Sequence, residues 1–182
     1  MADDVDLLQD KEDMIEMDEG PALPAGTQNL ITQAGYEAFA AELNRLTQDR
    51  PDLVRLLANA SANVDITDGA DFEIYRQKLR NLDNRIRYIA KRMDGFKVVN
   101  TAEQRQKEPN KVYFGATVKY EDEDGKHHKA TIVGVDEANA GEGRISWLSP
   151  LGRALLGAGL DEEVELRAPR GSRSLHVLEI SY

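Results

Sequence analysis

The stretch from Phe72 to Phe96 reads FEIYRQKLRNLDNRIRYIAKRMDGF and decides the fold of the N-terminal half. Its apolar residues alternate in steps of three and four, the spacing that keeps one apolar stripe on a helix packed against a partner. The stripe consists of Phe72, Tyr75, Leu79, Leu82, Ile86, Ile89, Met93 and Phe96. This pattern predicts one arm of a coiled coil, and such an arm needs a second helix of similar length.

The residues from Thr32 to about Asn63 supply that second helix. They repeat the heptad spacing with one polar exception at Arg50, and the apolar members are Tyr36, Phe39, Leu43, Leu46, Leu53 and Leu57. Pro51 follows Arg50, removes a backbone donor and disfavours helix at Arg50. We therefore expect a kink or a brief interruption there.

An antiparallel arrangement of the two arms gives one consistent register. Facing residues then have numbers with a constant sum, as in Leu43 with Ile89, Leu46 with Ile86, Leu53 with Leu79 and Leu57 with Tyr75. The same register places Glu42 near Arg92 and Asp49 near Arg85, which adds flanking pairs of opposite charge. At about 1.5 Å per residue, an arm of this length extends roughly 45 Å, more than a compact core requires.

The link between the arms, residues 64–71, carries Asp65, Asp68 and Asp71. Carboxylates three residues apart at a helix start face the same way, so Asp65 and Asp68 could share a ligand. Mg²⁺ prefers one or two carboxylates together with waters and phosphate oxygens. The D-x-x-D spacing is common in proteins without a metal site, and its position at the tip of a long hairpin is what singles it out.

Composition and charge limit the remaining possibilities. Residues 1–27 hold nine acids against Lys11 alone and end in a turn-rich run, which predicts a disordered acidic tail and linker. The tail could serve solubility, mimic nucleic acid or fold back on a basic surface. The chain has no cysteine, so disulfides and thiol chemistry are excluded. No apolar run approaches the roughly 18 residues of a membrane span, and we expect a soluble, cytoplasmic monomer.

The second arm is basic, with a net charge of +6 between Arg76 and Lys97. Arg85 and Arg92 are accounted for by pairs with the first arm. The other basic residues considered form a stripe at helical spacing: Arg76, Arg80, Arg87 and Lys91. The stripe is either a solvated helix face or a contact surface for phosphates, since clustered arginines on one side are typical of nucleic-acid binding.

After Asn100 the heptads give way to short strands. Residues 101–110 read as a polar linker, and residues 111–182 as a small α+β domain with an antiparallel sheet. The predicted strands are Lys111–Phe114, Ala116–Tyr120, Lys129–Val135, Gly143–Trp147, Glu163–Leu166 and Ser174–Ile180, with a turn at Glu123–Gly125. Leu151–Leu156 is predicted as a short helix with Pro150 at its start and Ser149 as its cap.

Two further groups of residues could carry chemistry. His127 and His128 lie beside acids in an apparent hairpin loop, but His176 is distant in sequence and no ligand cluster is evident, so a solvated loop is the favoured interpretation. Trp147 and Leu148 precede Ser149 and belong either to the core or to a docking patch. No Ser-His-Asp arrangement is apparent.

Several stretches resemble the Gre transcript-cleavage factors of bacterial RNA polymerase. The resemblance covers residues 28–182 and is carried by Asn84–Ile89, Phe114–Val118, Ile132–Ala138 and Ser149–Leu156; the basic second arm is more similar to GreB than to GreA. It implies a coiled-coil hairpin over residues 28–100 that enters the polymerase secondary channel. It also implies an FKBP-like second domain that docks on the channel rim, with contacts from Trp147, Ser149, Pro150, Leu151 and Leu155.

The apex departs from the Gre pattern. Gre factors carry Gly-Asp-x-x-Glu-Asn-Ala-acid-Tyr, and this chain has VDITDGADF over Val64–Phe72. By resemblance, Asp65 and Asp68 are the catalytic acids that hold a second Mg²⁺ together with the polymerase. Asp68 stands where the family has Glu, so its carboxylate is one methylene shorter. Val64, Gly69 and Phe72 also differ.

Three functions follow as hypotheses. The first is an accessory factor, not itself an enzyme, that stimulates Mg²⁺-dependent cleavage of backtracked nascent RNA by the polymerase. The second is a regulator that binds in the same channel without stimulating cleavage. The third is an unrelated coiled-coil adaptor or a prolyl isomerase, which would leave the acidic apex unexplained. We favour the first.

Overall fold

The structure is a computed structural model that describes residues 20–62, 70–168 and 171–182. It divides into two compact units. The helical unit contains Phe39–Asp94, and the β unit contains Leu23–Ala38 together with Gly95–Tyr182. Among the described helices, none is both long and apolar enough to span a membrane. The mixed α+β class predicted from the sequence is confirmed.

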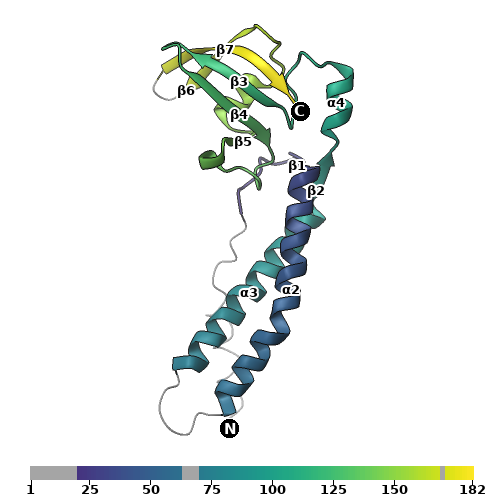
Figure 1. The fold of residues 1–182 in the computed structure, drawn as a ribbon, viewed down its shortest axis with the longest axis vertical. Coiled ribbons are helices and arrows are strands. Elements are labelled where there is room, and N and C mark those ends of the chain that lie inside the picture. The colour runs from purple at the N-terminus through teal and green to yellow at the C-terminus, as the bar shows by residue number, and fades with distance from the viewer. Residues whose placement is uncertain (1–19, 63–69, 169–170) are drawn as a thin grey trace. The chain divides into compact units, whose positions relative to one another are not determined.

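The helical unit consists of α3 (Ala70–Asp94) and the part of α2 (Gln33–Ala62) that begins at Phe39; the two helices lie side by side in Figure 1. The predicted apolar stripes are confirmed, because every apolar member on the two helices is half-buried or buried, and Ile89 is fully buried. The helix α2 continues through Pro51, so of the two alternatives expected there, a kink or a brief interruption, the interruption is wrong. The half-buried Leu46 and Leu53 on either side of the proline pack the helix in place, and tertiary packing overrides the local preference.

Ion pairs between described residues join the helices. Arg50, the polar member of the first stripe, donates two hydrogen bonds to Asp83, at 2.7 and 3.2 Å. Arg85 donates two to Glu42, at 2.8 and 2.9 Å, and this bond lowers the pKa of the Glu42 carboxyl. The antiparallel register expected from the sequence placed Asp49, rather than Glu42, near Arg85. A long guanidinium side chain can extend along the helix to a favourable bidentate partner, which a rule based on facing positions does not capture.

The β unit is built on a five-stranded sheet of order β5-β4-β3-β7-β6. All neighbours are antiparallel except β4 and β5. Its core includes Val118, Ile132, Leu155 and Val177, all fully buried. The strands are β3 (Thr117–Asp122), β4 (His127–Val133), β5 (Arg144–Ser146), β6 (Glu163–Ala168) and β7 (Gly171–Ser181), with a one-turn 3-10 helix at Ala140–Glu142.

One predicted strand, Lys111–Phe114, is wrong. Val112 and Phe114 are buried, which produced the alternating pattern, but the backbone of Val112 bonds to a loop, with its N–H 2.8 Å from the Ala158 carbonyl. Only Lys111 forms a β-bridge, with Gly159. The segment is therefore an anchored loop in the core.

The structure also contains elements that the sequence did not predict. The strand β1 (Asn29–Thr32) pairs in parallel with β2 (Phe96–Val99), which includes the last residue assigned to the second stripe. The short helix α4 (Thr101–Lys107) occupies most of the predicted linker. The helix α5 (Pro150–Leu155) agrees with the prediction, including its start at Pro150 and its cap at Ser149.

Candidate functional site

The proposed catalytic acids belong to the link between α2 and α3. Asp65 and Asp68 lie outside the described residues, so their geometry stays a prediction. Asp71 is exposed in the first turn of α3, with Glu73 beside it. Within the described ranges, no group of three or more His, Asp or Glu side chains is arranged to hold a metal ion. The predicted magnesium ligands Asp65 and Asp68 are of the donor type that Mg²⁺ prefers, but two carboxylates are too few to complete its shell.

The basic stripe lies along α3. Arg76, Arg87 and Lys91 are exposed and Arg80 is half-buried. Local bonds orient part of the stripe: Arg76 lies 3.4 Å from Glu73, and Arg87 donates to the Asn84 side chain at 2.5 Å. These contacts to neighbours on the same helix hold the guanidinium groups without removing them from solvent. The structure thus brings the predicted residues together on one accessible helix.

The predicted docking segment begins at the end of β5 and continues through α5. The Ser149 hydroxyl accepts a hydrogen bond from the Gly152 N–H at 3.0 Å, which caps the helix. Gly152 is required by close packing, because a Cβ there would lie 2.3 Å from the Ser146 carbonyl oxygen. The backbone around Pro150 is therefore held in a fixed shape.

The side chains of this segment divide into exposed and internal groups. Pro150 is exposed, whereas Trp147 and Leu151 are half-buried and pack against the sheet core. Leu155 is fully buried within that core. Leu155 cannot contact a partner directly, so its predicted docking role is corrected to internal support of α5. Pro150, Leu151 and Trp147 retain exposed surface for such a contact.

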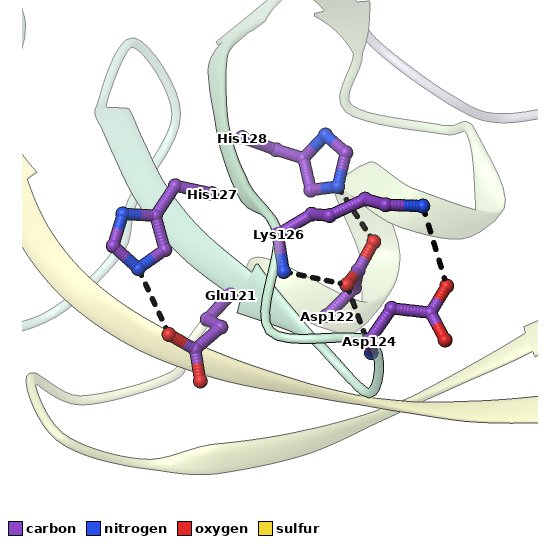
Figure 2. A network of polar contacts seen from close by, with 6 residues as sticks. All are labelled: Glu121, Asp122, Asp124, Lys126, His127 and His128. Atoms are coloured by element: carbon purple, nitrogen blue, oxygen red, sulfur yellow. Dashed lines mark hydrogen bonds and ion pairs between the residues drawn. The ribbon is translucent and has the colours of Figure 1, made fainter.

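The histidines belong to the β3–β4 hairpin (Figure 2). The ring nitrogen Nε2 of His127 lies 2.8 Å from Glu121, and that of His128 lies 2.7 Å from Asp122. Each imidazole therefore has one carboxylate partner in the hairpin. The predicted loop placement is wrong, because both histidines lie on β4, opposite Glu121 and Tyr120 of β3, but both are exposed.

Asp122 closes the turn of the same hairpin. Its Oδ1 accepts from the backbone N–H groups of Asp124 and Lys126, both at 3.0 Å, and Gly125 has a φ of +74° that favours glycine. The bond from His128 and the backbone bonds lower the pKa of the Asp122 carboxyl. The predicted turn at residues 123–125 is thus confirmed, and Asp122 is its organising residue.

One buried acid was not identified from the sequence as a functional candidate. Glu137 is 9% exposed and accepts hydrogen bonds from the backbone N–H groups of Thr32, at 2.9 Å, and Gly134, at 3.0 Å. Thr32 is 105 residues away in sequence, so no local pattern reveals that contact. The available signal was the acidic pair Asp136 and Glu137 directly after an apolar strand, where an exposed turn would be the ordinary interpretation.

Comparison with known proteins covers both halves of the chain. Residues 29–98 match the family model described as "Transcription elongation factor, N-terminal", and residues 106–182 match "Transcription elongation factor, GreA/GreB, C-term". Transcription elongation factor GreB of Pseudomonas aeruginosa is 41% identical over 163 residues, covering 89% of this chain and 95% of that protein. GreB of Neisseria meningitidis serogroup B is 35% identical, covering 86% and 95%.

A solved structure of the GreA factor homolog 1 protein (Gfh1) of Thermus thermophilus is also similar. It shares 24% identity, covers 86% of this chain and 100% of its own, and has a TM-score of 0.40. The identity to the GreB proteins over most of both chains decides the assignment. The chain therefore belongs to the GreA/GreB family of transcription elongation factors and lies closer to GreB.

Proposed function

We propose that this protein binds bacterial RNA polymerase through the secondary channel and stimulates the polymerase to cleave backtracked nascent RNA in the cytoplasm. The observation that carries the proposal is the family match over both halves of the chain, with a D-x-x-D sequence between the two long helices. The factor is an accessory protein, because the hydrolysis belongs to the polymerase active site.

Asp65 and Asp68 are proposed to hold a Mg²⁺ ion jointly with the polymerase. When bound, such an ion activates water and stabilises the displaced oxygen of the phosphodiester, as in two-metal hydrolysis. Two carboxylates alone leave most of the magnesium shell to waters and to the partner. The isolated factor is therefore expected to bind Mg²⁺ weakly.

The basic stripe has a separate role in this proposal. Arg76, Arg80, Arg87 and Lys91 would contact the phosphates of backtracked RNA or the channel wall, where charge-assisted bonds to phosphate are favourable. The exposure of Arg76, Arg87 and Lys91 along α3 supports that role. Docking is assigned to the exposed Pro150 and the half-buried Trp147 and Leu151.

A second candidate function is a channel-binding regulator that does not stimulate cleavage. The observation in its favour is the apex sequence, where Asp68 replaces the Glu of the Gre pattern and Val64 replaces Gly. A shorter carboxylate on a differently shaped loop could bind in the channel without completing the metal shell.

The deciding experiment adds the protein and Mg²⁺ to a stalled, backtracked bacterial elongation complex and follows the RNA on a gel. Short 3′ fragments support cleavage stimulation, and their absence with retained binding supports the regulator. Asp65→Asn is expected to abolish cleavage while polymerase binding stays unchanged, because the amide keeps the size and removes the charge. Asp68→Glu is expected to keep or raise cleavage. Cleavage that survives Asp65→Asn combined with Asp68→Asn would refute the metal assignment.

A further inference from the structure

The buried carboxylate of Glu137 has no role in the proposed mechanism, yet it organises the start of the longest helix. Thr32 precedes α2 and its hydroxyl oxygen accepts a hydrogen bond from the Gly35 N–H at 2.9 Å, as an N-cap residue does. The same hydroxyl donates to Glu137 Oε1, and the Thr32 N–H donates to Glu137 Oε2 at 2.9 Å. One carboxylate thus accepts hydrogen bonds from both the hydroxyl and the backbone N–H of Thr32.

This arrangement is a capping box whose acid comes from another part of the chain. In an ordinary capping box the residue three positions after the cap is Glu or Gln, and its side chain binds the N–H of the cap residue. Here that position is Gly35, and α2 has no acid in its first turn. The acid is supplied by Glu137, 105 residues away from Thr32.

The glycine is explained by the same geometry. A Cβ at Gly35 would lie 2.1 Å from Glu137 Oε1 and 2.4 Å from its Cδ. Any side chain at this position would therefore displace the carboxylate. The absence of a side chain at Gly35 leaves space for the Glu137 carboxylate. Glu137 therefore takes the place that an acid at position 35 has in an ordinary capping box.

Further contacts hold the same two segments together. Asn29, at the start of β1, donates to Asp136 at 2.9 Å. Gly134 approaches β1 so closely that a Cβ there would lie 2.2 Å from the Leu30 carbonyl oxygen. The turn that carries Glu137 is closed by its own N–H bonding to the Gly134 carbonyl at 3.2 Å. All of these residues belong to the β unit, so the first turn of α2 is fixed to the end of β4.

We propose that Glu137 is a positioning residue for transcript cleavage: it fixes the first turn of α2 to the β unit, and this attachment matters beyond the capping of the helix. The inference rests on the function proposed above. The helix α2 runs unbroken to Ala62, next to the link that carries Asp65 and Asp68. Over about 45 Å of helix, a change of direction of about 5° at the base moves the far end by about 4 Å. A misplacement of about 1 Å can cost a catalytic group about a hundredfold in rate.

The test separates attachment from capping with two variants. Glu137→Ala removes the acid of the capping box and, with it, the bonds from residue 137 that attach Thr32 to the β unit. Gly35→Glu combined with Glu137→Ala returns an acid to the ordinary capping-box position, so the helix is capped locally but is no longer held by residue 137. Glu179→Ala, which removes an exposed acid that pairs with Lys119, is the matched control.

Cleavage is measured on a backtracked complex over a range of factor concentrations. For Glu137→Ala we expect the maximal rate to fall at least tenfold while the half-maximal concentration changes less than threefold. The double variant should recover its helix content, measured by circular dichroism, but keep the low maximal cleavage rate. Glu179→Ala should cleave at the wild-type rate. Recovery of the wild-type rate in the double variant would assign Glu137 to capping alone and overturn the proposal. A wild-type rate in Glu137→Ala would overturn it as well.

A second readout does not depend on the polymerase. The chain has no cysteine, so Ala38→Cys on α2 and Lys129→Cys on β4, both exposed, can carry nitroxide labels within the β unit. The distance distribution should be narrow in the otherwise wild-type protein and broader in Glu137→Ala and in the double variant. If the wild-type factor binds polymerase without cleaving RNA, the proposed function fails, and the label widths then test the attachment alone. Equal widths in all variants would overturn the attachment too.

Discussion

Leu155→Ala tests how the docking segment is divided between support and contact. Leu155 is fully buried, and the substitution removes three carbon atoms, which is about 2.4 kcal/mol at about 0.8 kcal/mol per methylene. The remaining cavity raises the expected loss to about 3 kcal/mol of unfolding free energy. With a urea slope of about 1.2 kcal/mol per molar, the unfolding midpoint should fall by about 2.5 M.

The assay uses the fluorescence of Trp147. It is the one tryptophan in the sequence, and it packs against the sheet core, so its emission follows the unfolding of the β unit. Leu151→Ala is the matched control on the same helix. Leu151 is half-buried, and the loss of unfolding free energy should be about half as large, near 1.5 kcal/mol.

The effects on polymerase affinity should have the opposite order, with changes at Leu151 weakening binding more than Leu155→Ala. At a temperature where both variants are folded, Leu155→Ala should bind polymerase within about twofold of wild type. Leu151→Asp or Pro150→Gly should weaken the complex strongly. A Leu155→Ala variant whose midpoint moves by less than about 0.5 M, but whose affinity falls tenfold, would refute the division of the segment described here.

Three further predictions concern charged groups. In a double-mutant cycle with alanine at Arg50 and Asp83, whose side chains are 48% and 32% exposed, urea titrations should give a small favourable coupling that shrinks in 1 M NaCl. Because the pKa of Asp122 is lowered in the folded protein, its ionised form contributes stability above its ordinary pKa of 3.8, and this contribution is lost as the pH falls through the lower folded value. Asp122→Asn should therefore destabilise the β unit at pH 7 and differ less from wild type in acid; a difference that is constant with pH would contradict this. The last change replaces the whole basic stripe with alanine, at Arg76, Arg80, Arg87 and Lys91. Cleavage should weaken more on extensively backtracked complexes than on complexes backtracked by a few nucleotides. An equal loss of cleavage on both would show that the stripe is only a solvated helix face.

The helical unit could be predicted because its information is local and periodic. The three- and four-residue spacing of the apolar residues indicates which side of each helix is buried, and the burial of these residues in the structure follows that spacing. The cap and start of α5 were likewise local, since Ser149 and Pro150 act on the turn that follows them. What failed in the helices were statements about specific partners, as with Arg85, because a flexible side chain selects among several acids.

The β unit was less predictable because its decisive contacts join distant residues. Strands as short as Asn29–Thr32 and Phe96–Val99 carry too few residues for a period-two pattern, and each is next to a long helix along the chain, whose periodicity dominates the local signal. Val112 and Phe114 show that buried alternation alone does not make a strand when no neighbour pairs with it. Glu137 was missed for the same reason, since its role depends on a threonine 105 residues earlier.

The order of the sheet has a consequence for how the molecule is made. The strand β7 follows its two neighbours along the chain, yet it lies between β3 and β6 and pairs Thr117 with Ser181. During synthesis, β3 and β4 must therefore wait with one edge open until β7 emerges, whereas the contacts of α2 and α3 can form as soon as both helices are complete. Non-local strand pairing of this kind is slow and leaves exposed edges in the meantime. We expect the ribosome-bound intermediate to be a finished helical hairpin followed by an unfinished sheet, and chaperones to be needed most in that interval.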